Sequence, residues 1–316
     1  MSLRARRPVL HSLLFLLLAL PVPASQAATN GTGGSPATVH KSSGSSTSTR
    51  SVQHRHARRR VRRAPPGGVY ARSAVVLDPT TDQILYDKNS GDMAPIASLS
   101  KLMTALVFLE QRPDLDRSVE VTRDEISGAG RTKLQNHEQV ALRDLLHMSL
   151  MCSDNCATRV LVRESGIPRE DFLAAMNRKA IELGLARTRF VEVTGLDERN
   201  VSTAADCARL VRAAAANPII QDVTTTRSYE FRSHYRSWSR LHDLRNTNRL
   251  LYGHYDIRAG KTGFISEAGY CLATWIHTEG RDMIAVVLGA PTPATRFADV
   301  VRLVQRTSTT GAPQTN

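Results

Sequence analysis

Hydrophobic residues beyond Tyr70 form strand-like runs near both ends of the chain and helix-like patterns between them. Four runs are arranged as two pairs, and each pair encloses a short polar turn, which predicts strands. They are Ser73 to Leu77, Gln83 to Asp87, Gly269 to Thr278 and Met283 to Ala290. A strand hairpin is therefore expected at the beginning and at the end of the folded part.

The segment Leu99 to Gln111 is apolar on nearly all sides, which is typical of a helix at the centre of a domain. Helical spacing of apolar residues predicts further helices, around Leu142 to Leu150, Phe172 to Ile181, Thr203 to Ala216 and Ala294 to Arg306. Strands at both ends with helices between them favour an α/β (α+β) fold, in which helices cover an antiparallel sheet.

The first 27 residues have the composition of a secretory signal peptide. Three arginines precede an apolar run from Val9 to Leu20, and small residues follow at Ser25-Gln26-Ala27. The run is short for crossing a bilayer, which takes about 20 residues. We expect cleavage near Ala27 and an exported chain that is soluble or loosely membrane-associated; an uncleaved anchor is the alternative.

The charge is concentrated before the folded part. The chain has a formal net charge of +13, and 11 of its 42 basic residues lie in residues 1–63, which contain no acidic residue. Residues 28–67 are rich in Ser, Thr and Gly and then in Arg, which predicts a disordered linker with a basic arm. In an exported protein this arm predicts contact with an anionic wall or membrane surface and no nucleic acid; the alternative is a solvated tail.

Four cysteines raise the question of disulfides, and they are Cys152, Cys156, Cys207 and Cys271. An exported protein could pair them, but a domain of this size does not require such links. Cys207 and Cys271 lie in apolar runs, as buried thiols do. The spacing does not fit a zinc site, so the sequence predicts no metal and no cofactor.

Three short motifs follow one another in the order Ser98-Leu99-Ser100-Lys101, Ser153-Asp154-Asn155 and Lys261-Thr262-Gly263. Each motif alone is weak evidence because its residues are common. Together and in this order they are the signature of class A β-lactamases and penicillin-binding proteins.

The first motif supplies a nucleophile and a base. Ser98 and Lys101 are three residues apart, so they share one face of a helix and the amine reaches the hydroxyl. A serine needs a neighbouring base, and Lys101 is a base only if its pKa is lowered by burial or by a second cation such as Lys261. The alternative, a surface lysine, fits poorly with the apolar neighbours Leu102 and Met103.

The other two motifs supply the surroundings of the serine. Ser153 and Asn155 are expected to bond the two lysines and the substrate backbone; the alternative is a helix N-cap. Lys261 and Thr262 are expected to hold a substrate carboxylate, and Gly263 to let a peptide lie close to an edge strand. The backbone N–H groups of Ser98 and Phe264 are the candidate oxyanion hole.

With these motifs the chain resembles the low-molecular-mass penicillin-binding proteins, specifically the D-alanyl-D-alanine endopeptidase and carboxypeptidase group. The similarity covers residues 68–305 and includes the segments 94–105, 194–197, 200–203, 246–251 and 261–270. It implies a three-layer helix-sheet-helix sandwich, a catalytic domain at 68–306 followed by a polar tail at 307–316, and a periplasmic location. It also implies acylation of Ser98 by D-alanyl peptides of peptidoglycan and covalent inhibition by β-lactam antibiotics.

Two features bear on the subtype. Many carboxypeptidase relatives add a second β-domain and an amphipathic C-terminal helix, and the few polar residues after Arg306 favour the shorter, endopeptidase-like group. A β-lactamase of class A would need a Glu-x-x-Leu-Asn segment, and Glu170 to Ala174 departs from it at the last position. A β-lactamase and a non-catalytic wall-binding module are therefore the alternatives.

Overall fold

The computed structural model of the protein describes residues 68–310. Its strands are β1 (Ser73–Leu77), β2 (Ile84–Lys88), β3 (Ala94–Pro95), β4 (Ser118–Glu120), β5 (Gln139–Ala141), β6 (Val201–Ser202), β7 (Ser228–Tyr235), β8 (Trp238–Arg245), β9 (Asp256–Ile265), β10 (Gly269–Thr278) and β11 (Arg281–Ala290). Its helices are η1 (Ala97–Leu99), α1 (Ser100–Glu110), α2 (Arg123–Ile126), α3 (Leu142–Met151), α4 (Asn155–Glu164), α5 (Arg169–Glu182), α6 (Ala204–Ala215), α7 (Pro218–Thr225), η2 (Arg249–Tyr252) and α8 (Pro293–Thr310).

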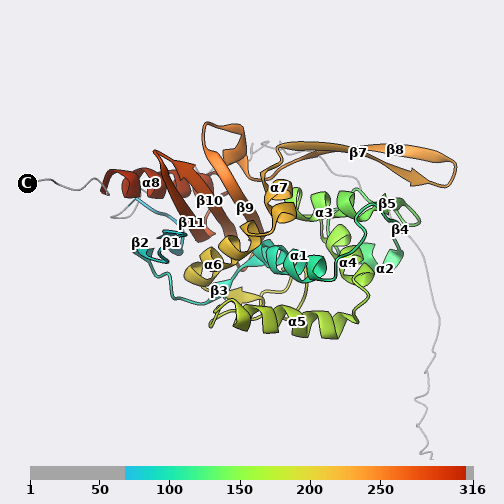
Figure 1. Cartoon of the computed structure of the whole chain (residues 1–316), viewed down its shortest axis with the longest axis horizontal. Helices are drawn as coiled ribbons and strands as arrows, with labels where there is room; N and C mark the ends of the chain where they lie inside the picture. Colours follow the sequence, from blue (N-terminus) through green and yellow to red (C-terminus); the bar gives the residue numbers. More distant parts are fainter. Residues whose placement is uncertain (1–67, 311–316) are drawn as a thin grey trace, which may run out of the picture. The chain divides into compact units, whose positions relative to one another are not determined.

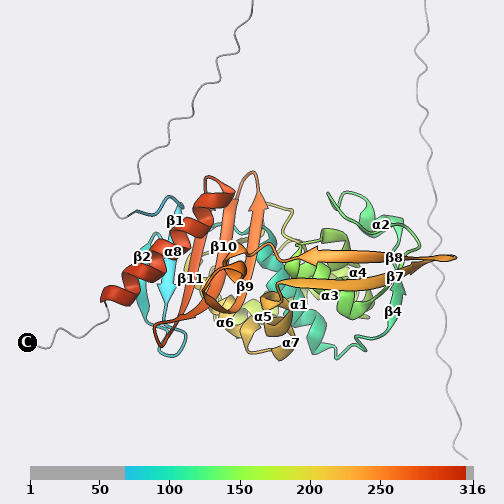
Figure 2. The same cartoon turned by 90° about the horizontal axis from the view of Figure 1, so that it is seen from above.

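A five-stranded antiparallel sheet in the order β2-β1-β11-β10-β9 forms the middle layer. Alternate residues of β1 point to opposite faces, as in any strand. Val75 and Leu77 pack into the core shared with the helices, whereas Val76 packs with Val300 and Leu303 of α8 on the other face. The sheet therefore lies between α8 on one face and the helical layer that contains α1 and α6 on the other (Figures 1 and 2), which confirms the predicted helix-sheet-helix sandwich.

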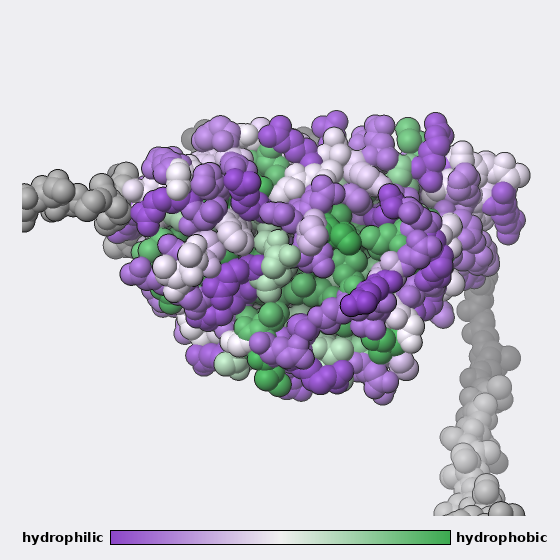
Figure 3. All heavy atoms as spheres, viewed as in Figure 1, coloured by the Kyte–Doolittle hydropathy of each residue, from purple (hydrophilic) through white to green (hydrophobic). Residues whose placement is uncertain are grey.

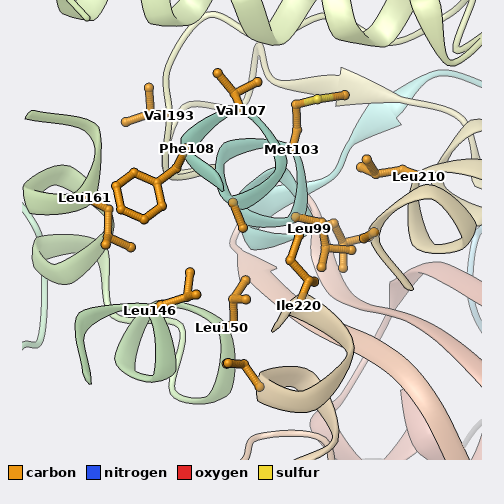
Figure 4. Close-up of a cluster of buried hydrophobic side chains, with 14 of the residues drawn as sticks. Leu99, Met103, Val107, Phe108, Leu146, Leu150, Leu161, Val193, Leu210 and Ile220 are labelled. Carbon is orange, nitrogen blue, oxygen red and sulfur yellow. The ribbon is translucent and has the colours of Figure 1, made fainter. Parts of the chain in front are cut away.

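The helix α1 is the centre of the helical layer. Its apolar residues Met103, Val107 and Phe108 are buried, and Figure 4 shows side chains of α3, α4, α6 and α7 around them, including Leu146, Leu150, Leu161, Leu210 and Ile220. In the space-filling view of Figure 3, apolar residues gather in a hollow over α1 and polar residues surround it. The all-round apolar pattern of this segment predicted that position.

The last helix continues to Thr310, four residues beyond the predicted end. Thr307 explains part of this extension because it is 7% exposed and its hydroxyl donates to the Leu303 carbonyl oxygen at 2.9 Å. No helix within residues 68–310 is long and apolar enough to cross a membrane. The predicted signal peptide at 1–27, the linker and arm at 28–67 and the last six residues of the tail lie outside the described residues.

A second, four-stranded sheet in the order β4-β5-β7-β8 was not predicted. Its longest part is the hairpin of β7 and β8, joined by Arg236 and Ser237. Two-residue hairpin turns favour Gly, Asn or Asp at positive φ, and here Arg236 adopts a φ of 49°. Two inward-facing positions are the polar residues Ser233 and His242, which also hides the usual alternation.

All four cysteines are free thiols, and Cys152 is the only one of them that is not buried. The described residues contain no group of three or more His, Cys, Asp and Glu side chains that could hold a metal ion.

Candidate active site

Ser98 lies in the single 3-10 turn η1, immediately before α1, and not in the α-helix itself. The preceding residue, Ala97, has a φ of 49°, which is unfavourable for a residue with a Cβ atom. The Ser100 hydroxyl donates to the Ala97 carbonyl oxygen at 2.9 Å. The turn presents the Ser98 side chain, which is half-buried, at the end of the buried helix.

Lys101 is fully buried beneath this serine. Its Nζ donates to three neutral oxygens, Ser98 Oγ at 3.2 Å, Asn155 Oδ1 at 2.6 Å and the Thr194 carbonyl at 2.5 Å. Burial lowers the pKa of Lys101 to about 7, although the carboxylates of Glu192 and Asp154 act in the opposite direction. An amine that is about half neutral near pH 7 is therefore within hydrogen-bonding distance of the serine hydroxyl.

The prediction that Lys261 acts as the second cation beside Lys101 needs correction. The pKa of Lys261 is itself lowered well below its usual range, first by burial and then by the charges of Lys101 and Arg296. Lys261 is not among the charges that shift the pKa of Lys101. Burial is thus the main cause of the lowered pKa of both lysines, and the charge of Lys101 lowers the pKa of Lys261 further.

The three residues of the second motif have separate positions. Asp154 is the N-cap of α4, and its carboxylate accepts the Ala157 N–H at 2.9 Å, so the cap alternative holds for this residue. Asn155 is the first residue of α4; it accepts from Lys101 and donates to the Ala129 carbonyl at 2.8 Å. Ser153 has a φ of 64°. Within the described residues no hydrogen bond joins its hydroxyl to either lysine, contrary to the prediction.

The third motif lies on β9, which is an edge strand as predicted. The Lys261 Nζ donates to the Thr262 carbonyl at 2.9 Å. The Thr262 hydroxyl is 4% exposed and pairs with the Thr247 hydroxyl at 2.7 Å, while the Thr247 N–H donates to the Met151 carbonyl at 3.0 Å. Thr262 therefore connects the sheet to the end of α3. Phe264 is 49% exposed and stacks on Tyr270 with ring centroids 4.2 Å apart.

Two glycines pack closely against the serine turn. A Cβ atom at Gly263 would lie 2.9 Å from the Ile96 carbonyl oxygen and 3.2 Å from the Ser98 nitrogen. A Cβ atom at Gly195, which has a φ of 87°, would lie 2.8 Å from the same Ser98 nitrogen. Gly263 is thus needed for the approach of the serine turn to β9, a reason that the sequence interpretation missed.

Two further residues, Glu192 and Asn200, support this site, and the sequence motifs gave them no role. The Glu192 carboxylate accepts the backbone N–H groups of Thr194 and Gly195. The Asn200 amide donates to the Ser100 hydroxyl at 3.1 Å and to the Glu192 carbonyl at 2.8 Å. Only the family resemblance covers their segment, because a loop of this kind has no periodic pattern.

Arg296 reaches the same strand from α8. Its Nη1 donates to the Gly263 carbonyl at 3.3 Å, and its buried Nε has no hydrogen-bond partner. Burial lowers the pKa of this guanidinium to about 10. A buried guanidinium therefore lies along β9 in addition to the Lys261 amine, although no motif near residue 296 indicated it.

Comparison with known proteins agrees with this geometry. Residues 59–292 match the family described as D-alanyl-D-alanine carboxypeptidase. A D-alanyl-D-alanine endopeptidase of Escherichia coli is 36% identical over 235 residues, which is 73% of this chain and 75% of that protein. A D-alanyl-D-alanine carboxypeptidase of Bacillus subtilis is 32% identical over a region that covers 74% of this chain and 61% of that protein.

The crystal structure of the Streptomyces K15 DD-transpeptidase superimposes with a TM-score of 0.73 at 25% identity, covering 78% of this chain and 98% of that one. The family match spans residues 59–292 and so includes the serine turn, the start of α4 and the edge strand β9. This chain therefore belongs to the D-alanyl-D-alanine carboxypeptidase family of serine peptidases.

Proposed function

We propose that this enzyme hydrolyses D-alanyl peptide bonds of peptidoglycan stem peptides through an acyl-enzyme on Ser98, with Lys101 as the general base. The observation that carries the assignment of roles is the fully buried Lys101 Nζ, 3.2 Å from Ser98 Oγ, with a pKa lowered to about 7. A base is most effective when its pKa lies near the working pH.

In the acylation step Ser98 Oγ attacks the carbonyl carbon of the D-alanyl bond and its proton moves to Lys101 Nζ. The oxyanion that forms accepts hydrogen bonds from the backbone N–H groups of Ser98 and Phe264. Lys101 then returns the proton to the leaving amine as the C–N bond breaks. Asn155 and the Thr194 carbonyl hold the amine in place throughout, because both contact its Nζ.

In the deacylation step a water molecule attacks the ester carbon, and its proton again moves to Lys101. Lys101 then returns this proton to Ser98 Oγ as the ester bond breaks, which restores the hydroxyl and releases the carboxylic acid. A β-lactam follows the first step, but its leaving amine remains tethered to the acyl group, so the ester persists on Ser98. Covalent labelling by a penicillin is therefore a direct measure of the first step.

The two buried basic groups along β9 are suited to a substrate carboxylate. Lys261 lies on the strand, and the Arg296 guanidinium contacts the Gly263 carbonyl from behind it. An anion beside them raises the pKa of both groups and offsets part of the free energy that burying their charges costs. We assign carboxylate binding to Lys261, Arg296 and the edge around Thr262, with Ser153 and Gly263 lining the approach to Ser98.

The endopeptidase-like relative supports cleavage within cross-links. This chain shares 75% of the length of the Escherichia coli endopeptidase but 61% of the Bacillus subtilis carboxypeptidase. We infer that the enzyme is exported to the periplasm by the signal peptide at 1–27, with the linker at 28–67 before a catalytic domain at 68–306. The Arg-rich arm would then contact an anionic wall or membrane surface.

The test is the Ser98→Ala variant. It should lose covalent labelling by a fluorescent penicillin and release of fragments from purified cross-linked peptidoglycan. Ser228→Ala is the matched control, since Ser228 is an exposed serine on β7. Labelling of Ser98→Ala at the wild-type rate would contradict the assignment of the nucleophile.

A further inference from the structure

The outer part of the β7–β8 hairpin combines arginines with exposed aromatic and aliphatic residues. From Phe231 to His242 the sequence contains three arginines and no acidic residue. Arg232, Arg236 and His234 are exposed, and Trp238 and Leu241 are 45% and 53% exposed. Exposed large apolar side chains surrounded by cations indicate a surface that binds a partner.

Apolar groups occur on both faces of this hairpin. The register places Tyr235 opposite Trp238 on one face and Arg232 opposite Leu241 on the other. Figures 1 and 2 show the turn end projecting beyond β4 and β5, and Figure 3 shows an apolar spot among polar residues over β7 and β8. A partner that surrounds the turn end fits this distribution better than a flat surface on one side.

The hairpin is held firmly at its middle. The His242 ring nitrogen Nε2 lies 2.7 Å from Glu138 Oε1 and 3.0 Å from Ser233 Oγ, and all three residues are at most 2% exposed. The Arg240 guanidinium donates to the Lys133 carbonyl at 2.9 Å. The turn end is therefore carried by a fixed element and not by a loop.

We propose that the outer end of this hairpin, from Arg232 to Leu241, docks the enzyme on an anionic lipid surface. Trp and Tyr favour the interface between water and lipid, and arginines near it are attracted to anionic head groups. Trp238 and Leu241 enter the interface while Arg232 and Arg236 contact the phosphates.

The ring geometry favours lipid over a sugar chain. Stacking on a sugar needs an open, flat ring face. The Tyr235 ring is tilted by 49° against Trp238, and the Arg236 guanidinium lies over it at 5.5 Å. The strands are eight residues long, so the turn lies about 25 Å from the hairpin base next to Thr247. Docking by the turn end therefore leaves the serine accessible to peptidoglycan.

Trp238 makes the test specific for the hairpin, because the Arg-rich arm is also proposed to contact anionic surfaces. The full chain contains two tryptophans, and Trp275 is half-buried with its Nε1 donating to Asp282 at 2.9 Å. In Trp275→Phe the fluorescence comes from Trp238 alone. It should shift to shorter wavelength on vesicles of phosphatidylglycerol and phosphatidylethanolamine and be quenched by brominated acyl chains, with no change on phosphatidylcholine vesicles.

Two further variants complete the test. Trp238→Phe retains only Trp275 and should show no shift; its difference from wild type gives the same information if Trp275→Phe folds poorly. Arg232→Gln with Arg236→Gln should weaken vesicle binding about 30-fold, while Arg178→Gln, an exposed arginine on α5, should not.

Three results would overturn the proposal. Co-sedimentation with anionic vesicles without any change at Trp238 would assign binding to the arm alone. A Trp238 shift on lipid-free sacculi but not on vesicles would identify a wall polymer as the partner. Absence of binding to either would show that the hairpin end is not a docking surface.

Discussion

Two buried polar clusters in this enzyme differ in the partners of their titratable groups. Lys101 contacts only neutral oxygens, and its pKa falls to about 7 because burial removes water from the ammonium group. At the second cluster, burial alone would raise the pKa of Glu138, but hydrogen bonds from His242, Ser233 and the Gln135 N–H outweigh it and the pKa falls. Glu138 therefore remains a carboxylate with matched donors.

The difference shows that burial alone does not make a residue reactive. Both Lys101 and Glu138 are completely inaccessible to water. Without a directly bonded carboxylate, the neutral form of Lys101 is populated near pH 7 and can take a proton. Glu138 has enough donors to keep its charge, so its cluster stabilises the hairpin and takes no part in the reaction.

The largest expected effect comes from removing the amine of Lys101, which is not bonded to any carboxylate. Lys101→Met keeps the length of the side chain but abolishes the base. Acylation by a fluorescent penicillin should slow by 10²- to about 10⁴-fold, the usual contribution of a general base. Stopped-flow labelling measures the rate, and a wild-type circular dichroism spectrum should show that the fold is retained. Labelling within tenfold of wild type would mean that another group activates Ser98.

A change in the Glu138 cluster should lower the stability of the protein and leave the acylation rate unchanged. Glu138→Gln removes the charge that accepts from His242 and Ser233, and we expect the free energy of unfolding to fall by about 3 kcal/mol at pH 7. Denaturant unfolding measures this loss. Glu230→Gln, at an exposed position of the same hairpin, should change stability by less than about 0.5 kcal/mol. Equal stability of the two variants would remove the distinction between the clusters.

A third variant should give Lys101 a directly bonded carboxylate, so that its charge is matched as the charge of Glu138 is. Asn155→Asp places a carboxylate at the position that is 2.6 Å from Lys101 Nζ. Protonated Lys101 would be stabilised, so its pKa should rise by about 1–3 units. In wild type the acylation rate should fall as pH drops below about 7, because Lys101 gains a proton. In the variant this decline should begin at higher pH.

The pH profile of penicillin labelling distinguishes this effect from simple damage to the site. A displaced acid limb with recovery of the rate at alkaline pH supports control by charge. A rate that is lower at every pH, with an unmoved limb, would show that Asn155 acts by geometry alone.

The sequence predicted the chemistry of the site better than its support. Ser98, Lys101 and Asn155 come together as expected because each lies next to a helix start that local spacing reveals. Glu192, Asn200 and Arg296 were missed because each reaches the site from a segment whose own pattern says nothing about it. Ser153 was assigned hydrogen bonds to the lysines that the structure does not show, and the pairing of the Thr262 hydroxyl with Thr247 was not anticipated.

The fold also has parts that the sequence predicted and a part that it did not. The central sheet and α1 were predictable because runs of Val, Ile, Leu and Met mark them. The β7–β8 hairpin was not, since its turn lacks glycine and its inner face contains Ser233 and His242. When the inward-facing residues of a strand are polar and hydrogen-bonded to one another, the sequence lacks the alternation of apolar and polar positions that predicts a strand.

The close packing of the serine turn against Gly195 and Gly263 makes the active site depend on the order in which the chain folds. These glycines come from segments far apart in the chain, and Gly263 belongs to a strand near its end. The nucleophile should therefore acquire its geometry only after β9 has docked, and a chain in which β9 has not yet joined the sheet should not be acylated. Penicillin labelling should thus serve as a reporter of complete folding, appearing only when the last strands have joined the sheet.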